Sequence, residues 1–265
     1  KGETFQLLFG DPHTHTGLSG DAEGDFTEML AYARDRAKLD FVAFTDNDWY
    51  QDHLSDRDWQ RTMTEDQAWS VDGSFIAVPG YEWTQPRWGP ARPQHRSILF
   101  ESYDQPLLRH RDIEGDPVEA LVAWIRTTNG IMNTQHAQFI LTESEREANL
   151  EVCCGWGDYI NDSKCFHEHL RKGFKVGFVG TSDGHRRTPG LGGGLTGLWV
   201  KEFTLAGIIE AFRQRRCFAT AGARVGLRFW VDDIFMGQTA RAGVDHTARI
   251  AVEAPREVER LEIFG

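Results

Sequence analysis

Short apolar runs recur along this chain, and their spacing limits its fold more than any other feature. Each run has the length of one β-strand, and stretches with the periodicity of an amphipathic helix lie between several of them. The runs cover residues 6–10, 41–45, 75–80, 97–100, 130–134, 150–154, 176–181 and 197–200. Strands that are apolar throughout and alternate with helices are typical of a parallel sheet covered by helices. About seven or eight such units predict an α/β fold that closes into a barrel.

The first residues of three intervening helices can be recognised. Asp25 and Glu28 form a capping box ahead of a helix that begins near Phe26. Pro117 takes a first-turn position in the segment 117–128, and Thr204 is the N-cap of the segment 204–216. By contrast, the polar segments 51–74 and 84–94 are predicted to be loops on the rim of the barrel.

The pattern changes after Ala223, where three strand candidates follow one another without a helix. We therefore expect residues 1–224 to form the barrel and residues 225–265 to begin a separate C-terminal β element. The last run, RLEIFG, is strand-like and has no turn after it. This predicts that the β element is truncated and that the chain is a fragment, from which any leader would be absent. The compartment, cytoplasmic or periplasmic and secreted, stays open.

The composition excludes several classes of protein. A net charge of -11, from 29 Lys+Arg and 40 Asp+Glu, repels phosphate backbones, so we expect no nucleic-acid partner. No stretch approaches the roughly 18 apolar residues of a membrane span. The 4 cysteines, with Cys153 and Cys154 adjacent, give neither a disulfide scaffold nor a C-x-x-C zinc site, and we interpret them as core thiols.

Residues with the chemistry of metal ligands directly follow the apolar runs. They are Asp11, His13, His15, Asp46, Glu82, His136, Asp183 and His185. In a parallel barrel the C-terminal ends of the strands meet on one face, so these side chains are expected in one cavity. Imidazoles and carboxylates without thiols predict a catalytic site for Zn²⁺, Mn²⁺ or Fe²⁺.

Two dyads strengthen this prediction. His13 and His15 are two residues apart, and on an extended strand such residues project to the same side. An isolated H-x-H has about even odds of being a core or surface pair. A second dyad, Asp183-x-His185, follows another apolar run, and this repetition favours a metal site.

These motifs resemble those of the PHP (polymerase and histidinol phosphatase) metal-dependent hydrolases. The motifs are DPHTHTGLSGD (11–21), TDND (45–48), PGYEW (79–83), HRSILF (95–100), Gln135-His136 and GTSDGH (180–185), and the resemblance spans about residues 7 to 220. GLGGGLTGLWV (190–200) and RRCFATAGAR (215–224) are similar to a large bacterial branch of this superfamily, which includes carbaryl-hydrolase-like metallohydrolases.

The resemblance implies a distorted (β/α)₇ barrel with two or three divalent ions. By position, His13, His15, Glu82 and Asp183 would hold the first ion; Glu82, His95 and His136 the second; and Asp21, Asn47 and His185 the third. Asp11 and Asp46 would orient imidazoles by accepting their free N–H, with Glu151 as a weaker candidate. Asn47 departs from the family, where a histidine is usual, so the third ion is expected to bind weakly unless Asp48 takes over.

The function that follows is hydrolysis of a phosphoester in a small molecule by a metal-bound hydroxide, with Asp46, Asp183 and His185 as catalytic residues. Two alternatives remain: the same metals could cleave a carboxylic or carbamate ester, or the chain could be a non-catalytic metal-binding or structural module. Neither G-x-S-x-G nor a P-loop is present. Arg96, Arg186 and Trp83 are predicted to bind substrate, and Trp49, Trp88 and Trp156 fall on the same rim loops. The oligomeric state stays open.

Overall fold

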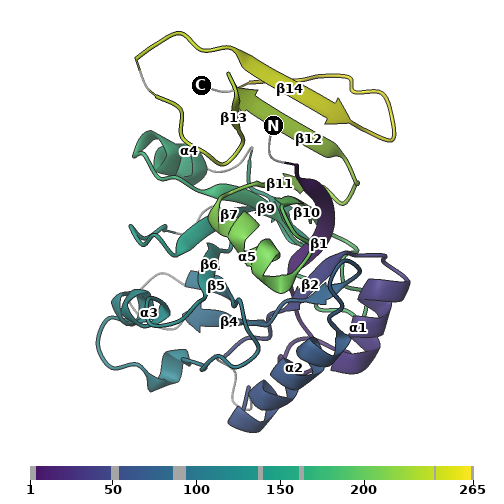
Figure 1. The fold of residues 1–265 in the computed structure, drawn as a ribbon. Coiled ribbons are helices and arrows are strands. Elements are labelled where there is room, and N and C mark those ends of the chain that lie inside the picture. The colour runs from purple at the N-terminus through teal and green to yellow at the C-terminus, as the bar shows by residue number, and fades with distance from the viewer. Residues whose placement is uncertain are drawn as a thin grey trace.

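The computed structural model describes residues 4–48, 54–85, 94–136, 140–160, 164–241 and 243–263. Their elements, in chain order, are β1 (Gln6–Thr14), α1 (Phe26–Asp35), β2 (Phe41–Phe44), α2 (Asp56–Trp69), β3 (Ile76–Ala77), β4 (Gly80–Gln85), β5 (Gln94–Leu99), the 3₁₀ turn η1 (His110–Asp112), α3 (Pro117–Ile125), β6 (Ile131–Thr134), β7 (Glu147–Cys154), β8 (Gly157–Asp158), α4 (Lys164–Arg171), β9 (Gly177–Gly180), β10 (Leu195–Val200), α5 (Leu205–Arg213), β11 (Cys217–Thr220), β12 (Gly226–Val231), β13 (Ile234–Phe235) and β14 (Ala248–Glu253). Figure 1 shows a mixed α/β arrangement.

The strands form three sheets. One sheet has the order β11-β10-β1-β2-β3, the second has the order β4-β5-β6-β7-β8 with β9 also on β7, and the third has the order β13-β12-β14. In the first sheet β1 runs parallel to β2 and antiparallel to β10. In the second, β5 is antiparallel to both neighbours, whereas β7 is parallel to β6 and β9.

The prediction of a closed (β/α)₇ barrel is wrong. Several neighbouring strands are antiparallel, and such strands pair without the crossover helix that a parallel barrel requires. Only isolated bridges, Thr14 with Gly184 and Asn47 with Glu82, link the two larger sheets at the site end. Across the ranges given above, no continuous ladder joins these sheets, so they lie together as two sheets instead of one barrel.

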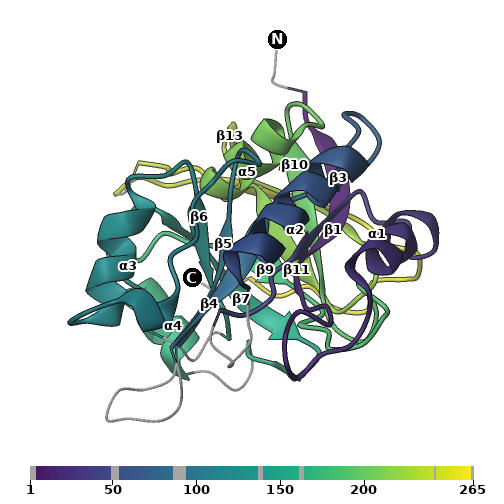
Figure 2. The ribbon, with the colours of Figure 1, turned by 90° about the horizontal axis from the view of Figure 1, so that it is seen from below.

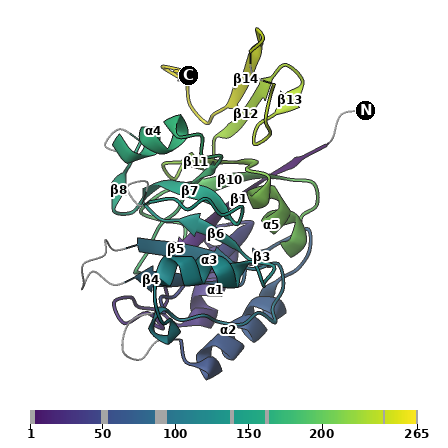
Figure 3. The same cartoon turned by 90° about the vertical axis from the view of Figure 1, so that its left-hand side faces the viewer.

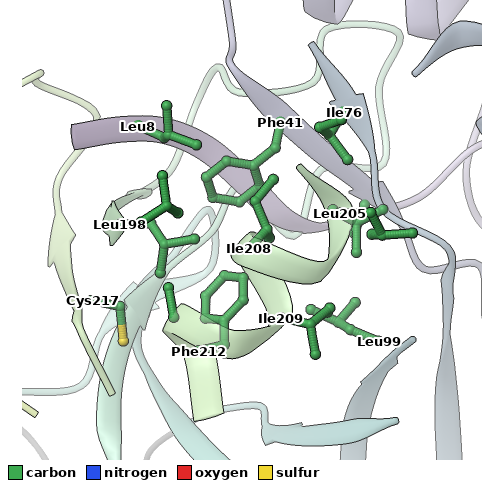
Figure 4. Close-up of a cluster of buried hydrophobic side chains, with 14 of the residues drawn as sticks. Leu8, Phe41, Ile76, Leu99, Leu198, Leu205, Ile208, Ile209, Phe212 and Cys217 are labelled. Atoms are coloured by element: carbon green, nitrogen blue, oxygen red, sulfur yellow. The ribbon is translucent and has the colours of Figure 1, made fainter. Parts of the chain in front are cut away.

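The hydrophobic core consists of several clusters, some between the two larger sheets and some on their outer surfaces. Figure 4 shows α5 with Ile208, Ile209 and Phe212 against Phe41 of β2 and Leu198 of β10, all of them buried. The helices α1 and α2 cover the outer surface near β2, β3 and β4, as Figure 2 shows from below. Because these clusters fix the strands that carry the polar residues, the site rests on a rigid frame.

The three predicted helices are present as α1, α3 and α5, although α3 ends at Ile125 and α5 at Arg213, before their predicted ends. The Asp25 side chain accepts hydrogen bonds from the N–H groups of Thr27 and Glu28, and the Thr204 side chain accepts one from that of Gly207. The loop prediction for 51–74 is wrong, because α2 occupies Asp56–Trp69. Its polar composition hid a buried face formed by Trp59, Thr62, Met63 and Asp66.

The predicted rim loop 84–94 overlaps the end of β4 and the first residue of β5. Residues 86–93 lie outside the described residues.

The third sheet, β12 to β14, stands beyond β10 and β11, at one end of the molecule (Figure 3). Phe235 packs on Trp199 and Phe218 of the first sheet, so an apolar cluster joins the two. The predicted β element therefore exists, while its separation as a domain stays a prediction. The last run is not a strand over residues 260–263. Within the described chain, we find no helix that is both long and apolar enough to span a bilayer.

Candidate metal centre

The ends of β1 and β9 are joined by backbone hydrogen bonds, which bring the two predicted dyads together. The N–H of Asp183 donates to the carbonyl of His13 at 3.0 Å, and the N–H of His15 donates to that of Gly184 at 2.9 Å. The bridge between Asn47 and Glu82 adds β4 to this end of the molecule. Residues far apart in sequence thus meet where the first two sheets approach each other.

Four of the predicted ligands form a buried group that we call the inner centre: His13, His15, Glu82 and Asp183. Asp183 Oδ1 lies 3.1 Å from His13 Nε2 and 3.3 Å from His15 Nε2, and Glu82 Oε2 lies 3.2 Å from His15 Nε2. Two ligand atoms at about 2.1 Å from one tetrahedral ion are about 3.4 Å apart. The inner centre therefore has the spacing of a ligand set around a single ion.

The histidines of the inner centre are oriented for binding a metal. Ser19 Oγ donates to Asp46 at 2.6 Å and lies 3.0 Å from His15 Nδ1. Because the serine proton is used on Asp46, His15 must donate from Nδ1, which leaves the Nε2 lone pair facing the centre. Among the residues described, Nε2 of His13 and of His15 is buried and makes no regular hydrogen bond. Such unsatisfied nitrogens fit a metal ion.

The carboxylates of the inner centre are held ionised by these histidines. Burial opposes the charge of Glu82, but the nearby imidazoles of His95 and His15 outweigh it and hold the pKa of Glu82 well below its usual range. Burial likewise opposes the charge of Asp183, but the nearby imidazoles of His13 and His136 outweigh it and lower the pKa of Asp183 well below its usual range. The centre therefore holds two buried anions, and a bound cation would compensate their charge.

Asp46 and Asp11 lie around the inner centre and hold its loops. Asp46 accepts hydrogen bonds from the N–H and hydroxyl of Thr16, both at 2.7 Å, besides that from Ser19. It orients His15 through Ser19, whereas the sequence predicts a direct contact with an imidazole N–H. Asp11 accepts from the N–H groups of Ser182 and Gly190, each at 2.9 Å. Asp11 thereby fixes the loop that carries Asp183.

The predicted second trio is divided between two places. His95 Nδ1 contacts Glu82 Oε1, on one side of the inner centre. His136 Nε2 lies 3.5 Å from Asp183 Oδ2, on another side. The backbones of His136 and Asp183 are left-handed, with φ of 52° and 43°. Such strain costs about 1–3 kcal/mol for a residue other than glycine and clusters at functional sites.

Sequence reasoning missed one residue of this region. Cys154 belongs with His136, Glu151 and Asp183 to a group whose ligand atoms all lie within 4.8 Å of one another. We interpreted its thiol as part of the core. Its position could have indicated this role. Cys154 is the last residue of an apolar run, and the position of residues at the ends of such runs is what pointed to the histidines.

Of the predicted third set, Asp21 and His185 line the cleft described below, whereas Asn47 is buried and is not part of that lining. His185 Nδ1 donates to the carbonyl of Asp183 at 3.0 Å, and its Nε2 lies 3.5 Å from Asp21 Oδ2. Asn47 Oδ1 is buried and accepts no hydrogen bond within the described ranges. Both oxygens of the Asp48 carboxylate accept backbone hydrogen bonds, from the N–H of Thr84 at 2.8 Å and from that of His110 at 2.5 Å.

The predicted substrate-binding residues differ in position. All three guanidinium nitrogens of Arg96 donate inside the protein, to Glu147, Gln94 and the carbonyl of Ile140, and Arg96 is 0% exposed. Trp83 is also 0% exposed and packs in the core around α2. Neither Arg96 nor Trp83 lines the cleft described next. Trp49 and Trp88 lie outside the described residues.

A cleft of about 540 Å³ opens beside the inner centre. Its lining includes Asp183, His185, Arg186, Trp156 and Leu191. Trp156 is 65% exposed, and its Nε1–H donates to the carbonyl of Asp183 at 3.1 Å. Of the predicted substrate-binding residues, Arg186 is therefore the one that borders the cleft.

Comparisons with known proteins cover different extents of the chain. Residues 181–253 match the model of a family described as a protein of unknown function (DUF3604). A comparison with curated proteins gave no match. Among solved structures, a two-domain protein from Bacteroides vulgatus ATCC 8482, containing a predicted PHP-like metal-dependent phosphoesterase, has a TM-score of 0.59 and 16% identity, with 96% of this chain and 88% of that chain covered.

A second solved structure is more distant. An amidohydrolase from Chromobacterium violaceum, with bound sulfate and no metal, has a TM-score of 0.43 and 14% identity, with 81% of this chain and 98% of that chain covered. The match to the Bacteroides protein confirms, at the level of the fold, the expected resemblance to PHP-type metallohydrolases. The narrower resemblance to carbaryl-hydrolase-like enzymes stays a prediction.

Proposed function

We propose that this protein is a divalent-metal-dependent hydrolase that cleaves a phosphoester. The observation that carries the proposal is the inner centre, where two imidazole Nε2 atoms and two ionised carboxylates converge at the spacing of metal ligands. Imidazole and carboxylate ligands suit Zn²⁺, Mn²⁺ and Fe²⁺. His13, His15, Glu82 and Asp183 would hold one ion, and the neighbouring His95, His136, Asp21 and His185 would contribute to one or two more. The fold shared with a PHP-like protein supports this proposal.

The residues around the ions would position the reactants. Divalent ions bound here would lower the pKa of a water molecule and polarise the phosphoryl group. Asp46 fixes His15 through Ser19, and Asp11 fixes the loop of Asp183. His185 is held at Nδ1 by the carbonyl of Asp183, so its Nε2 faces Asp21 at the cleft. Arg186, at the rim, would bind an anionic group of the substrate.

A second candidate is hydrolysis of a carboxylic or carbamate ester at the same centre. One observation favours it: the exposed indole of Trp156 and the exposed side chain of Leu191 give the cleft an apolar side. An aromatic ester without charge would bind there without help from Arg186. The two candidates therefore predict different substrates for the same metals.

The test is a substrate panel on metal-free protein and on protein loaded with Zn²⁺, Mn²⁺ or Fe²⁺. The panel contains p-nitrophenyl phosphate, bis-p-nitrophenyl phosphate, p-nitrophenyl acetate and an aryl carbamate. We expect metal-dependent cleavage of a phosphoester that is lost in Glu82→Gln. The control variant is Glu145→Gln, which should keep the activity, because Glu145 only pairs with Arg126 at the surface. Cleavage of only the acetate or carbamate would favour the second candidate. No cleavage by metal-loaded protein would contradict both.

A further inference from the structure

Strand β7 carries two adjacent cysteines, and an irregularity in this strand separates their environments. In the pairing with β9, Glu151 lies opposite Val179 and Cys153 lies opposite Gly180, so β7 has one additional residue at Val152. Such a bulge shifts the alternation of side chains by one position. Glu151 and Cys154 consequently share a side, although a regular strand would place them on opposite sides.

The two thiols confirm this separation. Cys153 Sγ donates toward the carbonyl of Thr220 at 3.5 Å. Cys154 Sγ lies 4.0 Å from Asp183 Oδ2 and 3.5 Å from the hydroxyl of Tyr159. Only Cys154 therefore faces the carboxylate that belongs to the inner centre.

Cys154 has three potential partner ligands around it. His136 Nε2 lies 3.5 Å from Asp183 Oδ2, and the Nδ1 atom of His136 is held at 2.5 Å from the Tyr159 hydroxyl. Glu151, which is 1% exposed, accepts a hydrogen bond from Thr181 Oγ1 at 2.7 Å, and the N–H of His136 donates to it at 3.2 Å. Each side chain is thus oriented by a neighbour outside the group.

The distances are close to those of a metal site. A sulfur at about 2.3 Å and an oxygen at about 2.0 Å from one tetrahedral ion are about 3.5 Å apart. The sulfur of Cys154 and Oδ2 of Asp183 are 4.0 Å apart, so a shift of about 0.5 Å would bring them to this separation. The four ligand atoms together lie within 4.8 Å of one another.

We propose that His136, Glu151, Cys154 and Asp183 form a metal position with a thiolate ligand, next to the position held by His13, His15 and Glu82. The proposal rests on the proposed function, because Asp183 would serve both positions. On binding, the S–H bond of Cys154 breaks, the proton passes to solvent, and the sulfur lone pair forms the bond to the ion. Thiolate ligands favour Zn²⁺ over Mn²⁺, so this position would select zinc.

The test uses metal-free protein loaded with Co²⁺, because a cobalt ion with a thiolate ligand has an intense near-ultraviolet charge-transfer absorption. We expect this absorption in the wild-type protein and in Cys153→Ser, and its loss in Cys154→Ser. After loading with Zn²⁺, the Cys154→Ser variant should hold about one ion fewer per chain than Cys153→Ser. The melting temperature of the two metal-free variants controls for folding.

The proposal is overturned if the absorption persists in Cys154→Ser, or if cobalt-loaded wild-type protein lacks it. Should Cys154→Ser fail to fold, X-ray absorption at the zinc edge of wild-type protein decides, since a sulfur neighbour at about 2.3 Å is expected. A shell of nitrogen and oxygen alone would overturn the proposal. Substrate cleavage without the thiolate signature would contradict this proposal only, and the signature without cleavage would contradict only the proposed hydrolase.

Discussion

Buried carboxylates occur in two regions of this molecule, and their ionisation differs. In the inner centre, Glu82 and Asp183 have pKa values well below their usual range. Asp48 and Asp66, which we call the outer carboxylates, are equally buried, yet burial raises the pKa of Asp48 to about 8 and that of Asp66 well above its usual value. The difference teaches that burial, helped by neighbouring carboxylates, raises the pKa of a carboxyl group that has no imidazole beside it, whereas adjacent imidazoles keep the inner pair charged.

The partners of each region explain this difference. Asp48 accepts only backbone N–H groups in the contacts described for it, and Oδ1 of Asp66 accepts no hydrogen bond from any residue that the structure describes. Glu82 and Asp183 each face several histidines. The inner centre therefore gathers charge that a cation would balance, whereas the outer carboxylates belong to the scaffold.

The largest expected effect is the loss of hydrolysis on neutralising the inner pair. Glu82→Gln or Asp183→Asn removes a charged ligand from the ions, and activity should fall at least about 1,000-fold, a scale seen for comparable electrostatic stabilisers. Steady-state rates on the best phosphoester of the panel measure it, and circular dichroism checks the fold. Near wild-type rates in both variants would show that the inner centre is not needed for hydrolysis.

A smaller effect is expected at Asp46, which acts on the inner centre through Ser19. Asp46→Asn should lower activity on the order of ten- to a hundredfold, because the metal ligands remain and the main change is in the orientation of His15. Ser19→Ala should have a similar effect, and the double variant should be little worse than either single one. Additive losses would show that Asp46 does not act through Ser19.

A third ion, held by Asp21, Asn47 and His185, should bind less tightly than the ion of the inner centre. Asn47 offers a neutral amide oxygen where Asp21 and His185 offer stronger ligands, and Asp48 is engaged elsewhere. After mild chelation, plasma mass spectrometry should find about two ions per chain, and Asn47→His should retain about three. Three tightly held ions in the wild-type protein, or no gain in the variant, would refute the weak third position.

The smallest effect concerns stability and the outer carboxylate Asp66. Its pKa is raised in the folded state, so its contribution to stability is full below the ordinary value of 3.8 and is lost as the pH rises toward the raised pKa. Asp66→Asn cannot ionise, so it should melt a few degrees higher than wild type at about pH 7.5 and show little difference at about pH 4, since about 1 kcal/mol corresponds to roughly 2–4 °C. Equal melting temperatures at both pH values would contradict the assignment of Asp66.

The sequence predicted the parts of the site that depend on local pattern. His13, His15 and Asp183, which the structure brings together, could be proposed as ligands because polar residues at strand ends are visible from a short window. The capped helices at Asp25 and Thr204 were found for the same reason. These features need only a few neighbouring residues.

Other features depend on pairings between distant segments. The antiparallel pairing of β1 with β10 joins residues as far apart in the sequence as Leu8 and Leu198, and because no local pattern shows it, the closed barrel was predicted wrongly. Arg96 pairs with Glu147, from another strand of the same sheet, and is thereby directed away from the cleft. Cys154 faces Asp183 because of the bulge in β7, which periodicity does not show.

The central claim is that the inner centre binds a catalytic divalent ion, and anomalous X-ray scattering from crystals of manganese- or zinc-loaded protein tests it most directly. The predicted result is a peak at about 2.0–2.2 Å from Nε2 of His13, Nε2 of His15 and a carboxylate oxygen of Glu82. Peaks only elsewhere, with His13 and His15 still contacting Glu82 and Asp183 directly, would contradict it.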